Sequence, residues 1–252
     1  MMKIEILQET SDHLVISKPI GVSVHPGAGP TSLKFRGIRE LTISDWLQEK
    51  YPEIKKLPWK TTERIGIVHR LDKDTSGILL LAKNPEALDY FQDQFKERSV
   101  EKHYQTLVAG KPPREQGSIN ALIRRDPKDR ERQKVEFIDF GLDESERKDS
   151  ATEYETIKTY SYKKQVLTLL DIKLKTGRKH QIRVHMKYEG CPVLGDQKYF
   201  TKPSKRLSKE LGLDRQFLHA VSLKFKSYPD GKEVEINDDL PDDLKSLIEK
   251  IS

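Results

Sequence analysis

Residues 69–83 read HRLDKDTSGILLLAK, a polar and charged run joined directly to an apolar one. Residues 78–82 do not alternate between apolar and polar side chains, so they predict a strand that is buried on both faces. Gly77 allows the backbone to turn sharply into this strand. We therefore expect Asp72 in a turn that is mounted on buried structure, which is the support that a reactive side chain needs.

The acidic turn is also open to simpler interpretations. Asp and Ser often bond only to turn amides. The spacing of Asp72 and Asp74 fits a calcium loop, but position twelve of such a loop is a bidentate Glu and the sequence has Lys83 there. A metal-bound Asp-x-Asp, as in sugar-nucleotide transferases, is a further alternative that Arg70 and Lys73 disfavour, because they would compete with the cation.

The composition indicates a globular chain, and its basic charge favours a polyanionic partner. The 252 residues include 35% hydrophobic residues, no apolar run near the roughly 18 residues of a membrane span, and no signal-peptide core. Cys191 is the single cysteine, so a disulfide framework and a cysteine-rich zinc site are excluded. A cytoplasmic protein is expected. The net charge of +6 and the pI of about 9.1 favour a nucleic acid as partner.

Apolar patterns and caps predict an α+β fold. Strands are expected at 4–7, 14–17, 78–82, 100–108, 118–123, 152–160, 165–174, 217–225 and 233–236. Helices are expected over 44–51 with Ser44 as cap, from Asn84-Pro85 through 95, over 178–188, and over 241–251. Residues 27–40 are expected to be irregular. Because most strands follow one another without helices between them, we expect one domain over 1–252 with a mixed, mostly antiparallel sheet flanked by helices.

Two further segments carry polar side chains suited to chemistry. Tyr104 starts a strand, with its neighbours in sequence on the opposite face, but a lone strand Tyr is usually a packing residue. If 178–188 is helical, His180 and Arg183 share one face near the helix start. Helix starts bind anions, and the guanidinium of Arg183 can bind a phosphate or carboxylate through two parallel hydrogen bonds. His180 and His185 are five residues apart and diverge around a helix, so no metal site is predicted.

The segment 124–134 contains more Arg and Lys than acidic residues and includes Pro127, which favours a projecting loop. A solvated loop is the simpler interpretation. An Arg-rich finger also neutralises RNA phosphates and offers planes on which bases stack. The candidate RNA-binding residues of this loop are Arg124, Arg125, Lys128, Arg130 and Arg132. A second basic loop at 202–206 is expected to extend the same surface.

Together these segments resemble the RluA-type pseudouridine synthases. The matching motifs are KPxG at 18–21 with HP at 25–26, HRLD at 69–72 with TSG at 75–77, KxY at 102–104, GRxHQxRxH at 177–185 and LHA at 218–220. They occur in the family's order over nearly the whole chain, and five ordered matches are far more specific than one. The resemblance implies the pseudouridine synthase fold, with a long mixed sheet and an active cleft across its middle.

The resemblance also implies a reaction and its residues. A uridine within RNA is isomerised: the bond from ribose to ring nitrogen breaks, the uracil turns and a carbon–carbon bond forms, with no cofactor. Asp72 would be the catalytic carboxylate, as nucleophile or base; Arg183 would pair with it and keep it ionised, and Tyr104 would stack on the uracil and take the proton from the new attachment carbon. The expected substrate contacts are His69, Arg70, Thr75, Lys102, Arg178, His180 and Gln181.

The sequence departs from the family pattern in two places. Cys191 stands where His is common, which affects a peripheral contact. The catalytic pattern begins within twenty residues of Met1, so we expect the N-terminal RNA-binding accessory domain of many relatives to be missing and substrate choice to rest on the catalytic domain. Ribosomal RNA and transfer RNA both remain open as substrates. No protein partner is implied, and a monomer is expected.

Two other functions compete with the synthase. One is a catalytically idle RNA-binding or folding factor, which would not require Asp72, Tyr104 and Arg183 together. The other is a retaining glycoside hydrolase or transferase with Asp72 and Asp74 as its paired carboxylates. The chain lacks the aromatic density that sugar-binding platforms need, with 8% aromatic residues.

Overall fold

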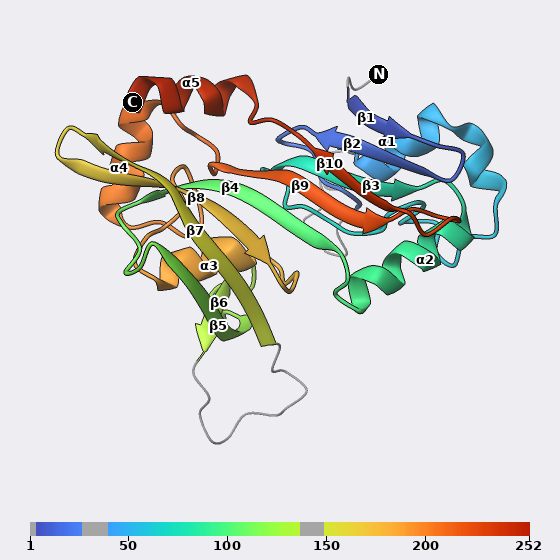
Figure 1. Ribbon diagram of the computed structural model, residues 1–252, viewed down its shortest axis with the longest axis horizontal. Coiled ribbons are helices and arrows are strands. Elements are labelled where there is room, and N and C mark those ends of the chain that lie inside the picture. Colours follow the sequence, from blue (N-terminus) through green and yellow to red (C-terminus); the bar gives the residue numbers. More distant parts are fainter. Residues whose placement is uncertain (1–3, 27–39, 137–148) are drawn as a thin grey trace. The chain divides into compact units, whose positions relative to one another are not determined.

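The computed structural model describes residues 4–26, 40–136 and 149–252, which fold as two compact units (Figure 1). One unit is formed by Met1–Val100 with Ser222–Asp238, the other by Glu101–Val221 with Asp239–Ser252. Strand β9 (Leu218–Lys226) begins in the second unit and ends in the first. The expectation of a single domain over 1–252 remains a prediction, and the expected irregular segment 27–40 lies outside the described residues except for its last position.

The first unit is a sheet with helices. Its strands follow the order β1-β2-β3-β9, with β10 paired to β9, and β2 is antiparallel to both β1 and β3. All seven residues of β3 are buried, which confirms the predicted buried strand. The other elements are β1 (Glu5–Glu9), β2 (His13–Lys18), β3 (Ser76–Ala82), β10 (Glu233–Asn237), α1 (Ile43–Lys50), the 3-10 helix η2 (Pro52–Lys56) and α2 (Pro85–Lys96).

Local sequence explains where the first-unit helices begin. The side chain of Asn84 accepts a hydrogen bond of 2.8 Å from the Ala87 amide, and Pro85 takes the first helical position of α2, as predicted. The predicted Ser44 cap of α1 is wrong. Thr42 is the cap instead, because its hydroxyl accepts from the Asp45 amide at 3.3 Å while the Asp45 carboxylate accepts from the Thr42 amide at 3.0 Å.

The second unit is an antiparallel sheet with three helices in its described part. Strand order is β9-β4-β8-β7-β5-β6, and the pairs β4/β8, β8/β7, β7/β5 and β5/β6 are antiparallel. Helix α3 packs against β6 and β7. The elements are β4 (Glu101–Ala109), β5 (Gln116–Arg125), β6 (Gln133–Glu136), β7 (Asp149–Tyr162), β8 (Gln165–Leu174), α3 (Gln181–Tyr188), α4 (Lys202–Leu211) and α5 (Asp242–Ile251).

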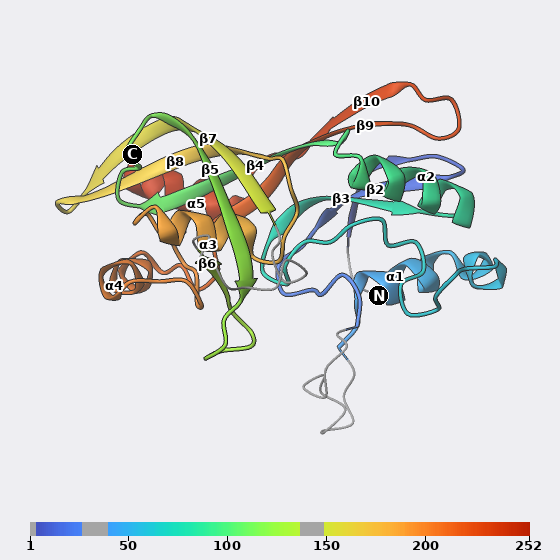
Figure 2. The same cartoon turned by 90° about the horizontal axis from the view of Figure 1, so that it is seen from below.

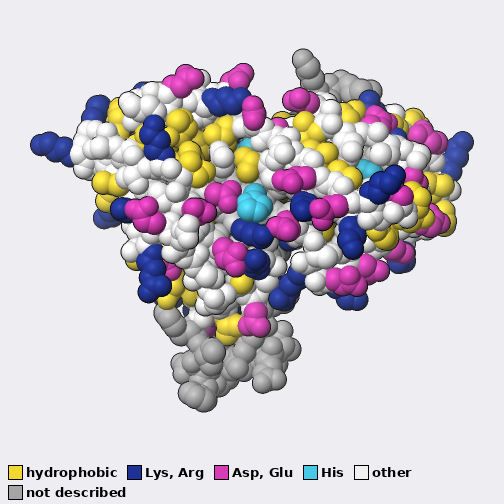
Figure 3. Space-filling model, in the orientation of Figure 1, with side chains coloured by type: hydrophobic (Ala, Val, Ile, Leu, Met, Phe, Trp, Pro, Cys, Tyr) yellow, Lys and Arg dark blue, Asp and Glu magenta, His cyan; other side chains and the backbone are white. Residues whose placement is uncertain are grey.

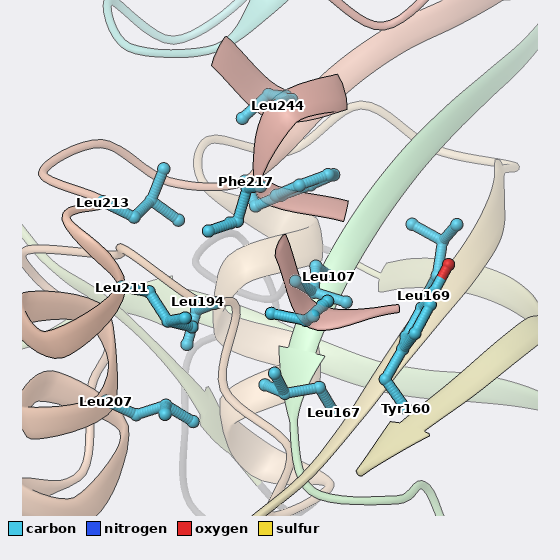
Figure 4. Packing of buried hydrophobic residues seen from close by; sticks show 12 residues of the cluster. Leu107, Tyr160, Leu167, Leu169, Leu194, Leu207, Leu211, Leu213, Phe217 and Leu244 are labelled. Carbon is cyan, nitrogen blue, oxygen red and sulfur yellow. The ribbon is translucent and has the colours of Figure 1, made fainter. Parts of the chain in front are cut away.

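An apolar cluster joins α4 and α5 to the strands of the second unit (Figure 4). Leu107 and Leu167 are fully buried strand residues, and they share the cluster with Leu211 from α4, Leu244 from α5 and Phe217 just before β9. Burying each such side chain contributes about 1.5–3 kcal/mol. This cluster holds the two helices on the sheet whose strand β4 also carries Lys102 and Tyr104.

The expected α+β class with a mixed, mostly antiparallel sheet and helices is confirmed. The predicted second basic loop at 202–206 is wrong, because these residues form the first half of α4. That helix is capped by Thr201, whose hydroxyl accepts from the Ser204 amide at 3.2 Å, and it buries Leu207 and Leu211 one turn apart. Among the described residues, no helix is long and apolar enough to cross a bilayer.

Candidate active site

Asp72 lies at the first position of a tight turn that leads into β3. The Thr75 amide donates to the Asp72 carbonyl at 3.1 Å and closes the turn over 72–75. Gly77 follows with φ +113°, a conformation that favours glycine, so the predicted sharp entry into the strand is confirmed. Asp72 is half-buried and Thr75 is buried. A half-buried Asp is thus held in a turn that leads directly into a buried strand.

The buried side chain of Lys18 holds this turn in place. Lys18 is 0% exposed, and its ammonium donates to the carbonyl oxygens of Pro19 at 2.7 Å, Val22 at 3.0 Å and Lys73 at 3.0 Å. A buried ammonium is strongly disfavoured unless its donors are satisfied, and these carbonyls satisfy them. Since Lys73 follows Asp72 directly, Lys18 fixes the backbone of the turn against the loop after β2.

His69 supports β3 through its ring. Its Nε2 accepts from the Leu80 amide at 3.0 Å, and the ring stacks on Phe95 with centroids 4.5 Å apart. Because Nε2 accepts a hydrogen bond, the ring is neutral and carries its proton on Nδ1. These contacts support β3, and the substrate contact that the resemblance implied for His69 remains a prediction.

Arg70 is exposed beside the turn, with Nη1 3.4 Å from Nε2 of His25. Nδ1 of His25 donates to the Pro26 carbonyl at 2.8 Å, which leaves Nε2 as an acceptor. Burial lowers the pKa of His25, the bond to Pro26 opposes this, and the neighbouring Arg70 and Arg64 lower it further. His25 is therefore neutral near pH 7 and Arg70 supplies the positive charge.

In the second unit, Lys102 and Tyr104 lie on one face of β4 and both are buried. Tyr104 is in register with Ile172 of β8. His103, between them, is less buried and its Nδ1 lies 2.9 Å from the Asp171 carboxylate. The predicted division of the strand into two faces is confirmed.

Gln181 locks the loop that precedes α3. Its Oε1 accepts from Thr176 Oγ1 at 2.8 Å and from the Arg178 amide at 2.9 Å, and its Nε2 donates to Ala151 and Thr152 of β7 at 3.0 and 2.9 Å. These four bonds fill the capacity of the side-chain amide, so Gln181 is a structural residue of the site. Arg178 is half-buried, and its Nε donates to the Asp149 carbonyl at 3.1 Å.

Helix α3 begins three residues later than predicted, because His180 takes a left-handed conformation with φ +58° and ends the loop. Such a conformation costs a non-glycine residue about 1 kcal/mol or more, which the contacts of the ring offset. Nδ1 of His180 lies 2.9 Å from the Tyr199 hydroxyl. His180 is therefore oriented toward Tyr199 from the helix start.

His185 is fully buried within a hydrogen-bonded chain. Gln181 donates to the hydroxyl of Thr152, this hydroxyl lies 3.0 Å from Nδ1 of His185, and Nε2 lies 2.9 Å from Ser150 Oγ, which donates to Ala121. Because the Ser150 hydroxyl donates to Ala121, it must accept from Nε2, and the Thr152 hydroxyl must donate to Nδ1. The ring is therefore neutral with its proton on Nε2. Burial lowers the pKa of His185 to about 4, so the neutral ring is the form near pH 7.

Arg183 forms a buried bidentate pair with Asp196. Nε donates to Oδ2 at 2.6 Å and Nη2 donates to Oδ1 at 2.9 Å, and Arg183 is 6% exposed. Burial raises the pKa of Asp196, but the bond to Arg183, its charge and the amides of Tyr199 and Lys198 outweigh burial, so the pKa is lowered. No sequence pattern indicated this partner, because Asp196 lies 13 residues beyond Arg183, outside the helix. The predicted pairing of Arg183 with Asp72 remains a prediction.

The basic segment 124–134 forms the β5–β6 hairpin, whose loop projects from the unit as predicted (Figure 2). Asp126 and Asp129 order the loop by accepting from the amides of Lys128 and Glu131 at 2.9 and 3.0 Å. Within the hairpin, Arg124 pairs with Glu136, and Arg132 pairs with Asp129 at 3.2 Å.

Three exposed residues of this hairpin, Arg125, Lys128 and Arg130, form no ion pair with the residues that the structure describes. We call them the hairpin cations. The face drawn in Figure 3 mixes Lys and Arg with Asp and Glu, so the net charge of +6 is not gathered there into one field. The hairpin cations are therefore a local group of positive charge on a mixed surface.

The family model for RNA pseudouridylate synthase matches residues 12–188. The chain belongs to the RluA-type RNA pseudouridine synthase family. An uncharacterized RNA pseudouridine synthase of Chlorobaculum parvum is 38% identical over 259 residues, covering 98% of this chain and 74% of that protein. Ribosomal large subunit pseudouridine synthase D of Blochmanniella floridana is 35% identical over 254 residues, covering 97% and 72%. The solved structure of human RNA pseudouridylate synthase domain containing 1 has a TM-score of 0.71 at 25% identity, covering 97% and 87%.

Membership of this family makes the chain an isomerase that converts uridine to pseudouridine in RNA. RNA is therefore its substrate, as the resemblance implied. The roles of the individual site residues, and the expectation that neither a metal nor a cofactor takes part, remain predictions.

Proposed function

We propose that this synthase modifies uridines of large-subunit ribosomal RNA, with Asp72 as its catalytic carboxylate and without a cofactor. The position of Asp72 carries the proposal. Asp72 is partly exposed, and it lies in a turn that is fixed by the Thr75 amide and by the ammonium of Lys18. The RNA class is suggested by relatives that are named as ribosomal large subunit pseudouridine synthases C and D. Transfer RNA is the other outcome of the test.

The chemistry is an isomerisation in which every heavy atom of the base is retained and one hydrogen is exchanged with solvent. The bond from the ribose carbon to the ring nitrogen breaks, the uracil turns, and the same ribose carbon bonds to the fifth ring carbon. That carbon then loses its proton, while the ring nitrogen gains one. Asp72 acts on the sugar as a nucleophile or as a base, and both routes need its carboxylate ionised.

Arg183 and Tyr104 supply the remaining catalytic functions in this proposal. Arg183 pairs with Asp72 and favours its charged form. Its bond to Asp196 is compatible with this role, because a guanidinium carries five N–H donors and the pair with Asp196 uses Nε and Nη2. Tyr104 stacks on the flipped uracil and accepts the proton from its fifth carbon.

The basic residues bind the RNA backbone in our proposal. Removing the target base from its stack costs a few kcal/mol, and phosphate contacts offset this cost. The hairpin cations and Arg70 are exposed and suited to phosphate. The proposed substrate contacts are His69, Arg70, Thr75, Lys102, Arg178 and His180, with Gln181 as a structural support. The enzyme is proposed to act as a cytoplasmic monomer.

Release of tritium tests the reaction and the RNA class together. Transcripts of large-subunit ribosomal RNA and of transfer RNA, labelled at the fifth carbon of uridine, are incubated with the enzyme. Release from the ribosomal transcript alone is expected. Release from transfer RNA alone would contradict the proposed substrate. Tight binding without release from either RNA would favour the idle RNA-binding factor.

A further inference from the structure

A continuous set of contacts connects Arg183 with the basic hairpin inside the second unit. It begins at Asp196, whose carboxylate binds the guanidinium through both oxygens. Oδ1 of the same carboxylate accepts from the amides of Lys198 at 2.7 Å and Tyr199 at 2.9 Å. One carboxylate therefore fixes both the direction of Arg183 and the backbone that carries Tyr199.

Tyr199 continues the connection to the hairpin. Cζ of Arg183 lies 5.2 Å from the centroid of the Tyr199 ring, and Tyr199 is 5% exposed. Its hydroxyl oxygen accepts from the amide of Gln133 at 2.6 Å and lies 2.9 Å from Nδ1 of His180. Gln133 is the first residue of β6, directly after the hairpin loop. The ring thus contacts Arg183 while the hydroxyl holds the hairpin.

We propose that Asp196 and Tyr199 are positioning residues that couple RNA binding by the basic hairpin to the orientation of Arg183. Asp196 sets the direction of the guanidinium. Tyr199 ties the base of the hairpin to that guanidinium, so an RNA backbone held by the hairpin cations lies in a fixed register with Arg183. This inference rests on the functions proposed above for Arg183 and the hairpin.

The two residues are expected to affect different kinetic constants. Tyr199→Phe keeps the ring over Arg183 but loses the bonds to Gln133 and His180, so KM should rise about fivefold while kcat stays within about twofold. Asp196→Asn replaces one oxygen by an NH₂ group that faces the guanidinium, so kcat should fall about 30-fold with little change in KM. Asp196→Glu restores the charge and should recover part of kcat.

Further variants distinguish positioning from a general loss of structure. Tyr199→Leu removes both the ring contact and the hydroxyl, so it should raise KM and lower kcat together. Tyr160→Phe is the matched control, because Tyr160 is equally buried in the second unit but packs in the apolar cluster with Leu107. It should change neither constant. All constants are referred to the concentration of folded enzyme, determined by urea unfolding of each variant.

Hydrogen exchange of the Gln133 amide gives a readout that needs no activity. Tyr199→Phe should lower its protection about fivefold or more, and Tyr160→Phe should leave it unchanged. If the wild type releases no tritium, the proposed function fails while this exchange still tests the connection. Unchanged Gln133 protection in Tyr199→Phe would overturn the inference. A fall in folded fraction with kcat and KM per folded molecule unchanged would also overturn it.

Discussion

Replacing His185 by Gln is expected to reduce the loss of unfolding free energy that occurs as pH falls below about 6.5. Burial lowers the pKa of His185 from 6.5 to about 4 in the folded state. As pH falls below 6.5, the unfolded chain therefore binds a proton at this residue before the folded chain does. The stability that the neutral ring contributes is complete above about pH 6.5 and is lost as pH falls toward 4. At about 1.4 kcal/mol per pH unit, the loss amounts to about 3 kcal/mol.

Urea unfolding at several values between pH 7 and pH 4 measures this loss. Gln retains a donor for Ser150 and an acceptor for Thr152, the two partners of the ring, but does not titrate. The pKa of His13 is also lowered by burial, and its contribution is common to both proteins and cancels in their difference. The wild type should lose about 3 kcal/mol more than His185→Gln over this range. Parallel curves for the two proteins would refute the reasoning.

Three further predictions concern the supports of the site and the RNA surface. Lys18→Met removes a fully buried ammonium and leaves three carbonyl oxygens without their donor, so it should lower the free energy of unfolding by about 3 kcal/mol in urea titrations; a change below about 0.5 kcal/mol would contradict this. Gly195→Ala places a Cβ 1.8 Å from the Arg215 carbonyl oxygen at φ +78°, so a loss of more than about 4 kcal/mol is expected, and a wild-type melting temperature would contradict it. Changing the hairpin cations to Gln should reduce the slope of log affinity against log salt by about 2, with an unchanged slope as the contrary result.

Where local rules decide the structure, the sequence predicted it. The apolar run 78–82 has no alternation, and it forms a strand buried on both faces. Asn84 and Pro85 start α2 because their preferences depend only on the next few residues. The turn that carries Asp72 follows from the same local chemistry. The roles of Asp72 and Tyr104 came from the family resemblance, since a turn Asp or a strand Tyr alone is usually structural.

What the sequence missed depends on partners far along the chain. Asp196 is an unremarkable loop acid until folding brings it to Arg183. Lys18 belongs to the KPxG motif, but only the fold shows that its ammonium binds three carbonyl oxygens. Strand β6 contains a single aliphatic residue, Val135, and exists because it pairs with β5. The late start of α3 reflects the left-handed backbone at His180, which no periodicity indicates.

The most direct test of the central claim compares Asp72→Asn with Asp74→Asn in single-turnover tritium release from ribosomal RNA. Asp74 is the matched control, because it is an exposed acid of the same turn. Wild type and Asp74→Asn should release tritium at similar rates, while Asp72→Asn should be slower by a factor of about 10³ or more although it still binds the RNA. Release by Asp72→Asn at the wild-type rate, or an equal loss in both variants, would contradict the assignment of Asp72 as the catalytic carboxylate.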